Sequence, residues 1–170
     1  ESTQNRGFPW VTEFEDSFCE LSGAKYSIAV NSATSGLHAA LVAADVGPGD
    51  EVIQPALTVI MNSLVTIACG ATPVFVDINP NTWNIDAASI SKKITPKTKA
   101  IMAVSLFGLP LDIEPIMDLA KKHNLIVIDD SAETITGNHK GKFPGTHADM
   151  AVYSFENKKH MTSGSEGGMV

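Results

Sequence analysis

Three short segments of the chain carry residue types that could do chemistry at one site. NSATS (31–35) opens a helical pattern directly after an apolar run, and it offers hydroxyl groups. LIVIDD (125–130) ends in two carboxylates, and SFENKKH (154–160) holds two adjacent lysines. Hydroxyl and helix N-terminal N–H groups bind anions, carboxylates bind cationic groups, and lysines act as nucleophiles or bases. Each of these residue types also has structural uses, so no single segment establishes a site.

The NSATS segment is suited to binding a phosphate group. The first N–H groups of a helix have no partner inside the helix, and Ser32, Thr34 and Ser35 add hydroxyl donors to them. A plain helix N-cap is the structural alternative. The segment matches neither the G-x-x-x-x-G-K-[ST] pattern of nucleotide triphosphate loops nor the G-x-G-x-x-G pattern of dinucleotide turns.

The acidic and basic segments also have more than one interpretation. Asp129 and Asp130 could bind magnesium, face a cationic ligand group, or simply solvate the end of a strand. Magnesium is the weakest of these, because the chain lacks the phosphate loop that accompanies such a site. Lys158 and Lys159 could be a solvated charge pair, or one of them could lie near apolar groups and act as nucleophile or base.

The pattern of apolar residues predicts which elements position these segments. Short apolar runs alternate with helical patterns along the chain. Within each run the apolar residues are consecutive and do not alternate with polar residues. This favours an α/β fold, a three-layer α/β/α arrangement with a mostly parallel sheet. Ligands of such folds bind beyond the carboxyl ends of the strands, where all three segments are expected. We predict strands at 26–30, 51–55, 72–78, 99–107, 125–130 and 148–155, and helices at 8–23, 31–46, 57–70, 86–94 and 112–124.

Composition excludes several classes of protein. The chain has 170 residues, 44% of them hydrophobic and 18% charged, which is typical of a globular domain. A net charge of −7 argues against nucleic acid as a partner. No apolar run reaches the about 18 residues of a membrane span, and ESTQNRGFPW lacks the apolar core of a signal peptide, so we expect no membrane partner and a cytoplasmic protein.

Cysteines and histidines add no metal or disulfide signal. Cys19 and Cys69 lie in apolar contexts, and we expect two reduced thiols in the core. The five histidines show no metal-ligand spacing with cysteines or carboxylates, so no metal site is expected.

One cofactor would use all three segments together. Pyridoxal phosphate needs an anion cradle for its phosphate, a carboxylate that keeps its ring nitrogen protonated, and a lysine that forms the Schiff base. The freed lysine then moves a proton as acid and base. The chain offers the cradle, the carboxylate and the lysine in that order, each at the end of a predicted strand.

Further motifs make the family recognisable. They include VNSATSGLHAAL, GPGDEVIQPALT, GATPVFVDI, FGLPLDI, LAKKHNLIVIDDSAE and SFENKKHMTSGSEGGMV, in this order over residues 9–170. With these motifs the chain resembles the DegT/StrS-type sugar aminotransferases, a family of fold type I pyridoxal phosphate enzymes. The resemblance implies pyridoxal phosphate as cofactor, a keto-sugar nucleotide as substrate, glutamate as amino donor and a homodimer. It also suggests sugars of bacterial surface polysaccharides, such as the perosamine of lipopolysaccharide.

The resemblance assigns a role to individual positions of the acidic and basic segments. The family places its Schiff-base lysine after Ser-Phe and three variable positions, which selects Lys159 over Lys158. Ser154 takes the position whose hydroxyl contacts the cofactor phosphate. Asp130 matches the aspartate that pairs with the pyridinium nitrogen, and Glu133 a position beside the cofactor ring.

Two further positions match the family with a substitution. Thr34 and Ser35 match its Gly-Thr-Ser phosphate loop, in which Ala33 replaces the usual glycine. Val59 stands where the family usually stacks an aromatic side chain on the cofactor ring. An aliphatic side chain can exclude water there but gives no ring stacking, so the resemblance implies weaker cofactor binding or a cover from elsewhere.

The extent of the chain leaves alternatives open. Family members are much longer, so we expect residues 1–170 to form a single pyridoxal-phosphate-binding large domain that is incomplete at its C-terminus. A truncated, non-catalytic fragment is one alternative to an active aminotransferase, and a dehydratase or lyase of the same fold is another. Members that remove a hydroxyl tend to have histidine at the lysine position, so Lys159 favours amine transfer. The sugar and the carbon that is aminated stay open.

Overall fold

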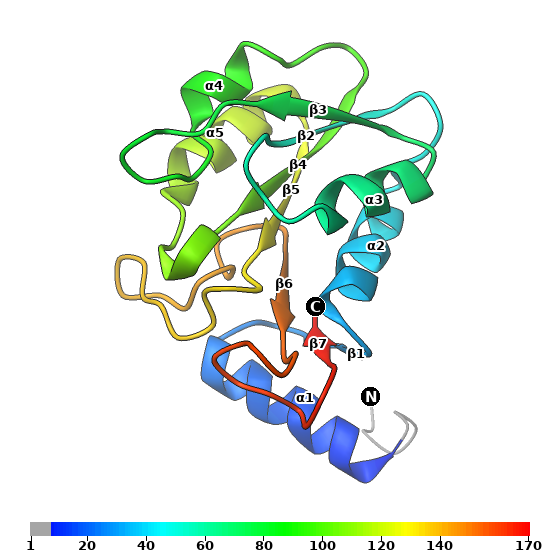
Figure 1. Cartoon of the computed structure of the whole chain (residues 1–170), viewed down its shortest axis with the longest axis vertical. Coiled ribbons are helices and arrows are strands. Elements are labelled where there is room, and N and C mark those ends of the chain that lie inside the picture. The colour runs from blue at the N-terminus through cyan, green and yellow to red at the C-terminus, as the bar shows by residue number, and fades with distance from the viewer. Residues whose placement is uncertain (1–7) are drawn as a thin grey trace.

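The computed structural model describes residues 8–170, and its centre is one mixed sheet. Within these residues the sheet has seven strands in the order β1-β7-β6-β5-β4-β2-β3 (Figure 1). The strands are β1 (Ala29–Val30), β2 (Glu51–Pro55), β3 (Thr72–Val76), β4 (Thr98–Val104), β5 (Ile126–Asp130), β6 (Met150–Ser154) and β7 (Gly168–Met169). Strands β2 to β6 pair in parallel, whereas β7 pairs antiparallel with both β6 and β1. The predicted, mostly parallel α/β sheet is confirmed.

Helices cover both faces of the sheet. They are α1 (Pro9–Ser22), α2 (Ala33–Ala43), α3 (Met61–Ala68), α4 (Ala87–Ser91) and α5 (Ile113–His123), with a short 3-10 turn at Leu106–Gly108. Alternate residues of a strand point to opposite faces, and β4 shows the division. Ala100 and Met102 join a core cluster with α2 and α3, whereas Ile101 and Ala103 join one with α4 and α5. Figure 1 shows these two helix pairs on the two sides of the sheet.

Helix α1 packs at the far end of the sheet, against β6 and β7. Its Phe18 contacts Tyr153 and Phe155 edge-to-face, at centroid distances of 4.9 and 6.1 Å. These rings form a third apolar cluster with Met169 of β7. The cluster anchors the loop that follows β6, and this loop contains the lysine pair.

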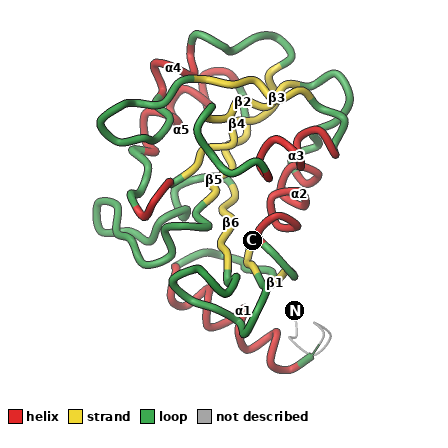
Figure 2. Tube along the Cα trace, viewed as in Figure 1, coloured by secondary structure: helices red, strands yellow, loops and turns green. Residues whose placement is uncertain are grey.

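The structure corrects the limits of several predicted elements. The helix predicted at 57–70 begins only at Met61, because the preceding residues form a turn. The strand predicted at 26–30 is limited to Ala29–Val30, and the helix at 86–94 to α4. Figure 2 shows β5 and β6 joined by a long loop rather than by a helix. Cys19 and Cys69 are free, and both are only partly buried.

Strand β7 brings two predicted phosphate-binding segments together. Gly168 pairs with Ser154 at the end of β6. On its other side, a Cβ atom at Gly168 would lie 2.7 Å from the backbone N of Ala33, at the start of α2. Only a glycine lets the strand approach the N-terminus of α2 so closely.

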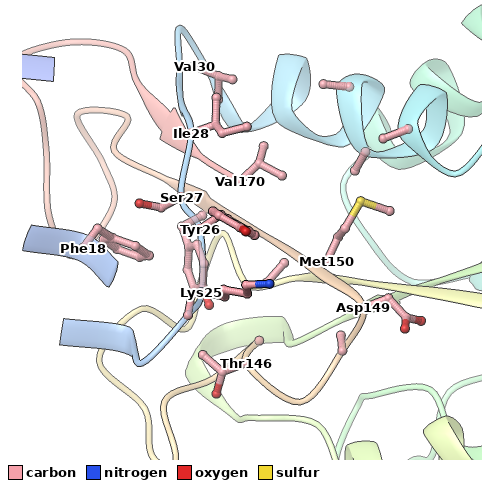
Figure 3. Close-up of a pocket in the computed structure, with 18 of the residues that line it drawn as sticks. Phe18, Lys25, Tyr26, Ser27, Ile28, Val30, Thr146, Asp149, Met150 and Val170 are labelled. Carbon is pink, nitrogen blue, oxygen red and sulfur yellow. The ribbon is translucent and has the colours of Figure 1, made fainter. Parts of the chain in front are cut away.

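A separate apolar cleft of about 500 Å³ lies between residues 25–28 and β6 (Figure 3). Ile28 and Val170 exchange two backbone hydrogen bonds at its upper end, with N···O distances of 2.8 and 3.0 Å. Tyr26, Met150 and Thr146 are among the side chains around it. None of the predicted site residues lines this cleft. Among residues 8–170, no helix has the length and apolar character that crossing a membrane requires.

The close approach at Gly168 predicts a stability effect. A Gly168→Ala substitution places a methyl group against backbone atoms, which cannot move aside as a side chain can. We expect the free energy of unfolding in urea to fall by about 1–3 kcal/mol. Gly47→Ala is the matched control, because its added methyl group meets nothing within 4 Å, and it should change stability by less than about 0.5 kcal/mol. Equal unfolding midpoints for the two variants would contradict the close approach.

Candidate active site

A cavity of about 270 Å³ lies at the carboxyl ends of β4 and β5. It brings together Val59, Asp130, Glu133 and Lys159, which are far apart in the sequence. Strand β5 supplies Asp130, the loop after it supplies Glu133, and the loop after β6 supplies Lys159. The complete lining consists of Leu57, Thr58, Val59, Val104, Leu106, Phe107, Asp130, Ala132, Glu133 and Lys159.

Asp130 is the buried carboxylate of this cavity, with 2% of its surface exposed. Its Oδ1 accepts a hydrogen bond from the backbone N of Ala132 at 3.1 Å, and its Oδ2 accepts one from Asn62 Nδ2 at 2.9 Å. Burial raises the pKa of Asp130, while these two hydrogen bonds and the charge of Lys159 act in the opposite direction. The pKa of Asp130 is raised overall, because burial outweighs the hydrogen bonds and the charge of Lys159, which partly stabilise the carboxylate.

Lys159 is held by an ion pair with Glu133. Its Nζ lies 3.2 Å from Glu133 Oε1, and the two side chains are 25% and 35% exposed. The other carboxylate oxygen, Oε2, accepts a hydrogen bond from the backbone N of Phe107 at 3.0 Å. Phe107 has a φ of 53°, which is uncommon for an aromatic residue, and this left-handed turn aims its N–H group at Glu133.

The neighbouring lysine has different surroundings. Lys158 is exposed, and it is absent from the lining of the cavity. The structure therefore distinguishes the two lysines by position, and only Lys159 extends toward Asp130 and Glu133.

The predicted phosphate segment forms the first turn of α2. Ser32 is the N-cap, and its Oγ accepts a hydrogen bond from the backbone N of Ser35 at 3.2 Å. The N of Gly36 bonds to the carbonyl of Ser32 at 3.0 Å. Within the described residues, the N–H groups of Ala33 and Thr34 make no hydrogen bond, and together with the helix dipole they can bind an anion.

Ser154 lies beside this helix end. It is the last residue of β6 and is buried, with 5% of its surface exposed. It lies on the same face of the sheet as Val152, which packs against α2. The predicted phosphate-binding residues Ala33, Thr34, Ser35 and Ser154 thus flank β7, although none of them belongs to the lining of the cavity.

Two contributors to the site were missed by sequence reasoning. Asn62 is fully buried in α3 and contacts Asp130, and the backbone of Phe107 holds Glu133. A single amide in an otherwise apolar stretch is a signal that could have identified Asn62, because buried polar groups need partners. No comparable signal marked Phe107 beyond the glycine that follows it.

The second acid of LIVIDD has a different environment. Asp129 is 3% exposed, and strand alternation points it toward the α4 and α5 face. Its Oδ1 accepts hydrogen bonds from Ser105 Oγ at 3.3 Å and Ser131 Oγ at 3.1 Å. Burial, with a smaller contribution from the charge of Asp130, raises the pKa of Asp129 to about 7.

A cluster outside the cavity contains the kinds of side chain that hold metal ions. Asp112, Glu114 and His139 place their ligand atoms within 4.8 Å of one another. Lys140 Nζ already lies 3.2 Å from Asp112 and 2.8 Å from Glu114, so an ammonium group balances these carboxylates.

The fold matches that of aminotransferase large domains, which is the class of protein to which the chain is similar. The chain belongs to the DegT/DnrJ/EryC1/StrS aminotransferase family, whose family model matches residues 1–170. A GDP-perosamine synthase of Caulobacter vibrioides is 48% identical over 161 residues, which are 95% of this chain and 43% of that protein. The chain thus spans less than half the length of this curated relative.

Solved structures agree with this assignment. An aminotransferase from Psychrobacter cryohalolentis matches with a TM-score of 0.92 and 43% identity, over 94% of this chain and 40% of that one. NtdA from Bacillus subtilis, solved with bound cofactor PMP, matches with a TM-score of 0.89 and 34% identity, over 96% of this chain and 37% of that one. The predicted family and fold are confirmed.

The raised pKa of Asp129 predicts a pH-dependent stability. Between the usual pKa of 3.8 and about 7, the folded chain holds a proton that the unfolded chain has lost. Stability from this group is therefore complete below pH 3.8 and is lost as the pH rises through about 7, at roughly 1.4 kcal/mol per pH unit at most. An Asp129→Asn variant lacks this dependence.

We expect the free energy of unfolding of the wild type, relative to Asp129→Asn, to fall by up to about 3 kcal/mol between pH 5 and pH 7. Urea unfolding of both proteins at several pH values measures this difference. Gly47→Ala is the control, because it changes no titratable group and its added methyl group meets nothing within 4 Å, so its difference from the wild type should stay constant. A constant difference for Asp129→Asn as well would show that Asp129 is ionised in the folded chain.

Proposed function

We propose that the chain is the cofactor-binding part of a pyridoxal phosphate-dependent aminotransferase. In this proposal it transfers an amino group, with glutamate as donor, to a keto-sugar nucleotide. One observation carries the proposal: Lys159, Asp130 and Glu133, which come from segments far apart in the sequence, line one cavity at the carboxyl ends of β4 and β5. The name of the Caulobacter relative makes a GDP-linked keto sugar the first substrate to test.

The residues present fit this cofactor. The N–H groups of Ala33 and Thr34, with the hydroxyls of Ser35 and Ser154, would bind its phosphate. Asp130 would pair with its ring nitrogen, because it is a buried carboxylate whose hydrogen bonds favour its charged form. Lys159 would provide the amine that binds it covalently.

When bound, the cofactor supplies an electron sink that makes the proton on the substrate Cα acidic. The protein's own contribution is to place charges and to move protons. The carboxylate of Asp130 would stabilise a positive charge on the ring nitrogen, and this charge would support the electron sink. The amine of Lys159 would remove the proton from the Cα of the amino donor and, in the second half of the reaction, deliver a proton to the sugar carbon that gains the amine, as general base and acid.

Glu133 positions Lys159 in this scheme. Its two oxygens are engaged by different partners, the amine of Lys159 and the N–H of Phe107. The carboxylate is thus fixed from one side while it holds the flexible lysine from the other. In the proposed reaction this contact keeps the amine inside the cavity between proton transfers.

Two other functions remain as alternatives. Because the chain spans less than half of its relative's length, a fragment that binds cofactor without turnover is one of them. A dehydratase or lyase of the same fold is the other, and water elimination without amine transfer would identify it. Turnover of keto-sugar nucleotide and glutamate by the 170-residue chain would exclude the fragment hypothesis.

A homodimer completes the proposal, since the resemblance places such sites at a subunit interface.

The position of Lys159 predicts the site of covalent labelling. After incubation with pyridoxal phosphate and borohydride reduction, peptide mapping should find the label on Lys159. Lys159→Ala should lose the label and the visible absorbance band of the lysine-bound cofactor. Lys158→Ala, the matched control, should keep both, because this lysine is exposed and outside the cavity. A label on Lys158, or none in the wild type, contradicts the assignment.

The side chain at position 59 predicts the strength of cofactor binding. Val59 lines the cavity and is 48% exposed, so an aromatic ring there could cover the cofactor. Val59→Tyr should lower the dissociation constant of pyridoxal phosphate roughly two- to tenfold, as measured by absorbance titration. Ile60→Tyr is the control, since Ile60 is exposed and outside the cavity. Equal effects of both variants would mean that residue 59 does not face the ring.

A further inference from the structure

We propose that Asn62, held in place by Thr58, is a positioning residue that keeps the carboxylate of Asp130 oriented and negatively charged for the cationic ring of a bound ligand. The inference rests on the proposed function, in which Asp130 contacts the cofactor ring. It adds a residue that acts through Asp130 and does not line the cavity itself.

The contacts of Asn62 form a chain from the cavity wall to the carboxylate. Thr58 lines the cavity, and its hydroxyl donates to Asn62 Oδ1 at 3.0 Å. Asn62 Nδ2 donates to Asp130 Oδ2 at 2.9 Å. Asn62 is fully buried in the first turn of α3, so no water competes for either end of its amide.

A third contact fixes which end of the amide faces Asp130. Asn62 Nδ2 also lies 3.1 Å from the sulfur of Met102, on strand β4. A thioether sulfur accepts hydrogen bonds but cannot donate them, so the NH₂ group must point this way. The carbonyl end therefore faces Thr58, and Asp130 meets a donor that stabilises its ionised form.

The charged groups around Asp130 make this donor necessary. Lys159 favours the ionised carboxylate, whereas Glu133 disfavours it, and Asp129 is a second acid in the next position of the strand. Without Asn62, the groups among residues 8–170 that oppose the effect of burial on Asp130 would be the N–H of Ala132 and the charge of Lys159. A carboxyl group that takes up a proton could no longer balance a positively charged ring.

The direct test is the titration of Asp130 itself by carboxyl ¹³C NMR of the 170-residue chain without cofactor. The Asp130→Asn spectrum identifies its signal. Asn62→Leu removes the donor and should raise the pH midpoint of Asp130 by about one to two units, the range expected for a charge-assisted hydrogen bond. Thr58→Val, which leaves the Asn62 amide free to rotate, should raise the midpoint of Asp130 by less than Asn62→Leu does. Thr58→Ser, which keeps the hydroxyl, should have the wild-type midpoint.

A matched control separates this effect from general loss of packing. Gln54 is another fully buried amide, which bonds to Ser63 and Thr66 rather than to Asp130. Gln54→Met should leave the midpoint of Asp130 unchanged. If Asn62→Leu does not fold, the comparison of Thr58→Val with Thr58→Ser decides the question alone.

The outcomes distinguish this inference from the proposed function. An unchanged midpoint in Asn62→Leu, or equal midpoints in the two Thr58 variants when only these fold, overturns the role of Asn62. Failure of the wild type to bind pyridoxal phosphate overturns the proposed function, while the titration still decides whether Asn62 controls Asp130. When both hold, Asn62→Leu should also weaken pyridoxal phosphate binding more at pH 6 than at pH 8, because the neutral form of Asp130 that this variant favours is more populated at the lower pH.

Discussion

The buried carboxylate of Asp130 is the constraint on which the rest of the site depends. A charge with 2% exposure at the end of a central strand is unfavourable unless donors and an opposite charge surround it. Here the donors come from α3 and from the turn after β5, and the opposite charge comes from the loop after β6. The ionised carboxylate of Asp130 is therefore stabilised only when α3, β5 and the loop after β6 pack together.

The two adjacent acids show how strand geometry separates their roles. Asp130 points to the face covered by α2 and α3, where an amide and a lysine favour its charge. Asp129 points to the opposite face, where only serine hydroxyls and a backbone N–H reach it. Burial raises the pKa of both carboxyl groups, and for Asp129, to which the charge of Asp130 adds a smaller contribution, the pKa reaches about 7.

Much of the fold followed from the sequence because its signals are local and repeated. Continuous apolar runs indicated buried parallel strands, and parallel strands place their carboxyl ends at one edge. From this rule the sequence predicts that the segments of Lys159, Asp130 and Thr34 lie at the same edge of the sheet. The choice of Asp130 over Asp129 and of Lys159 over Lys158 came from the family resemblance, because local patterns do not reveal which face a side chain takes.

The missed features depend on tertiary contacts. The helix predicted at 57–70 begins at Met61, and this later start leaves Thr58 free to bond with Asn62 across the turn. Phe107, with its left-handed backbone, donates a hydrogen bond to Glu133, and Glu133 contacts Lys159. The two partners of each contact lie 26 positions apart, so no short stretch of sequence contains both. Such contacts become visible only when the packing of α3 and of the loops after β4, β5 and β6 is known.

In the proposed function, Asp130, Lys159 and the N-terminus of α2 contact one bound molecule. A crystal structure of the chain with pyridoxal phosphate tests it most directly. We expect electron density for the phosphate at the N–H groups of Ala33 and Thr34, for the ring nitrogen at Asp130, and for a covalent bond to Lys159. Electron density for the cofactor in any other place, or a ring nitrogen turned away from Asp130, would contradict it.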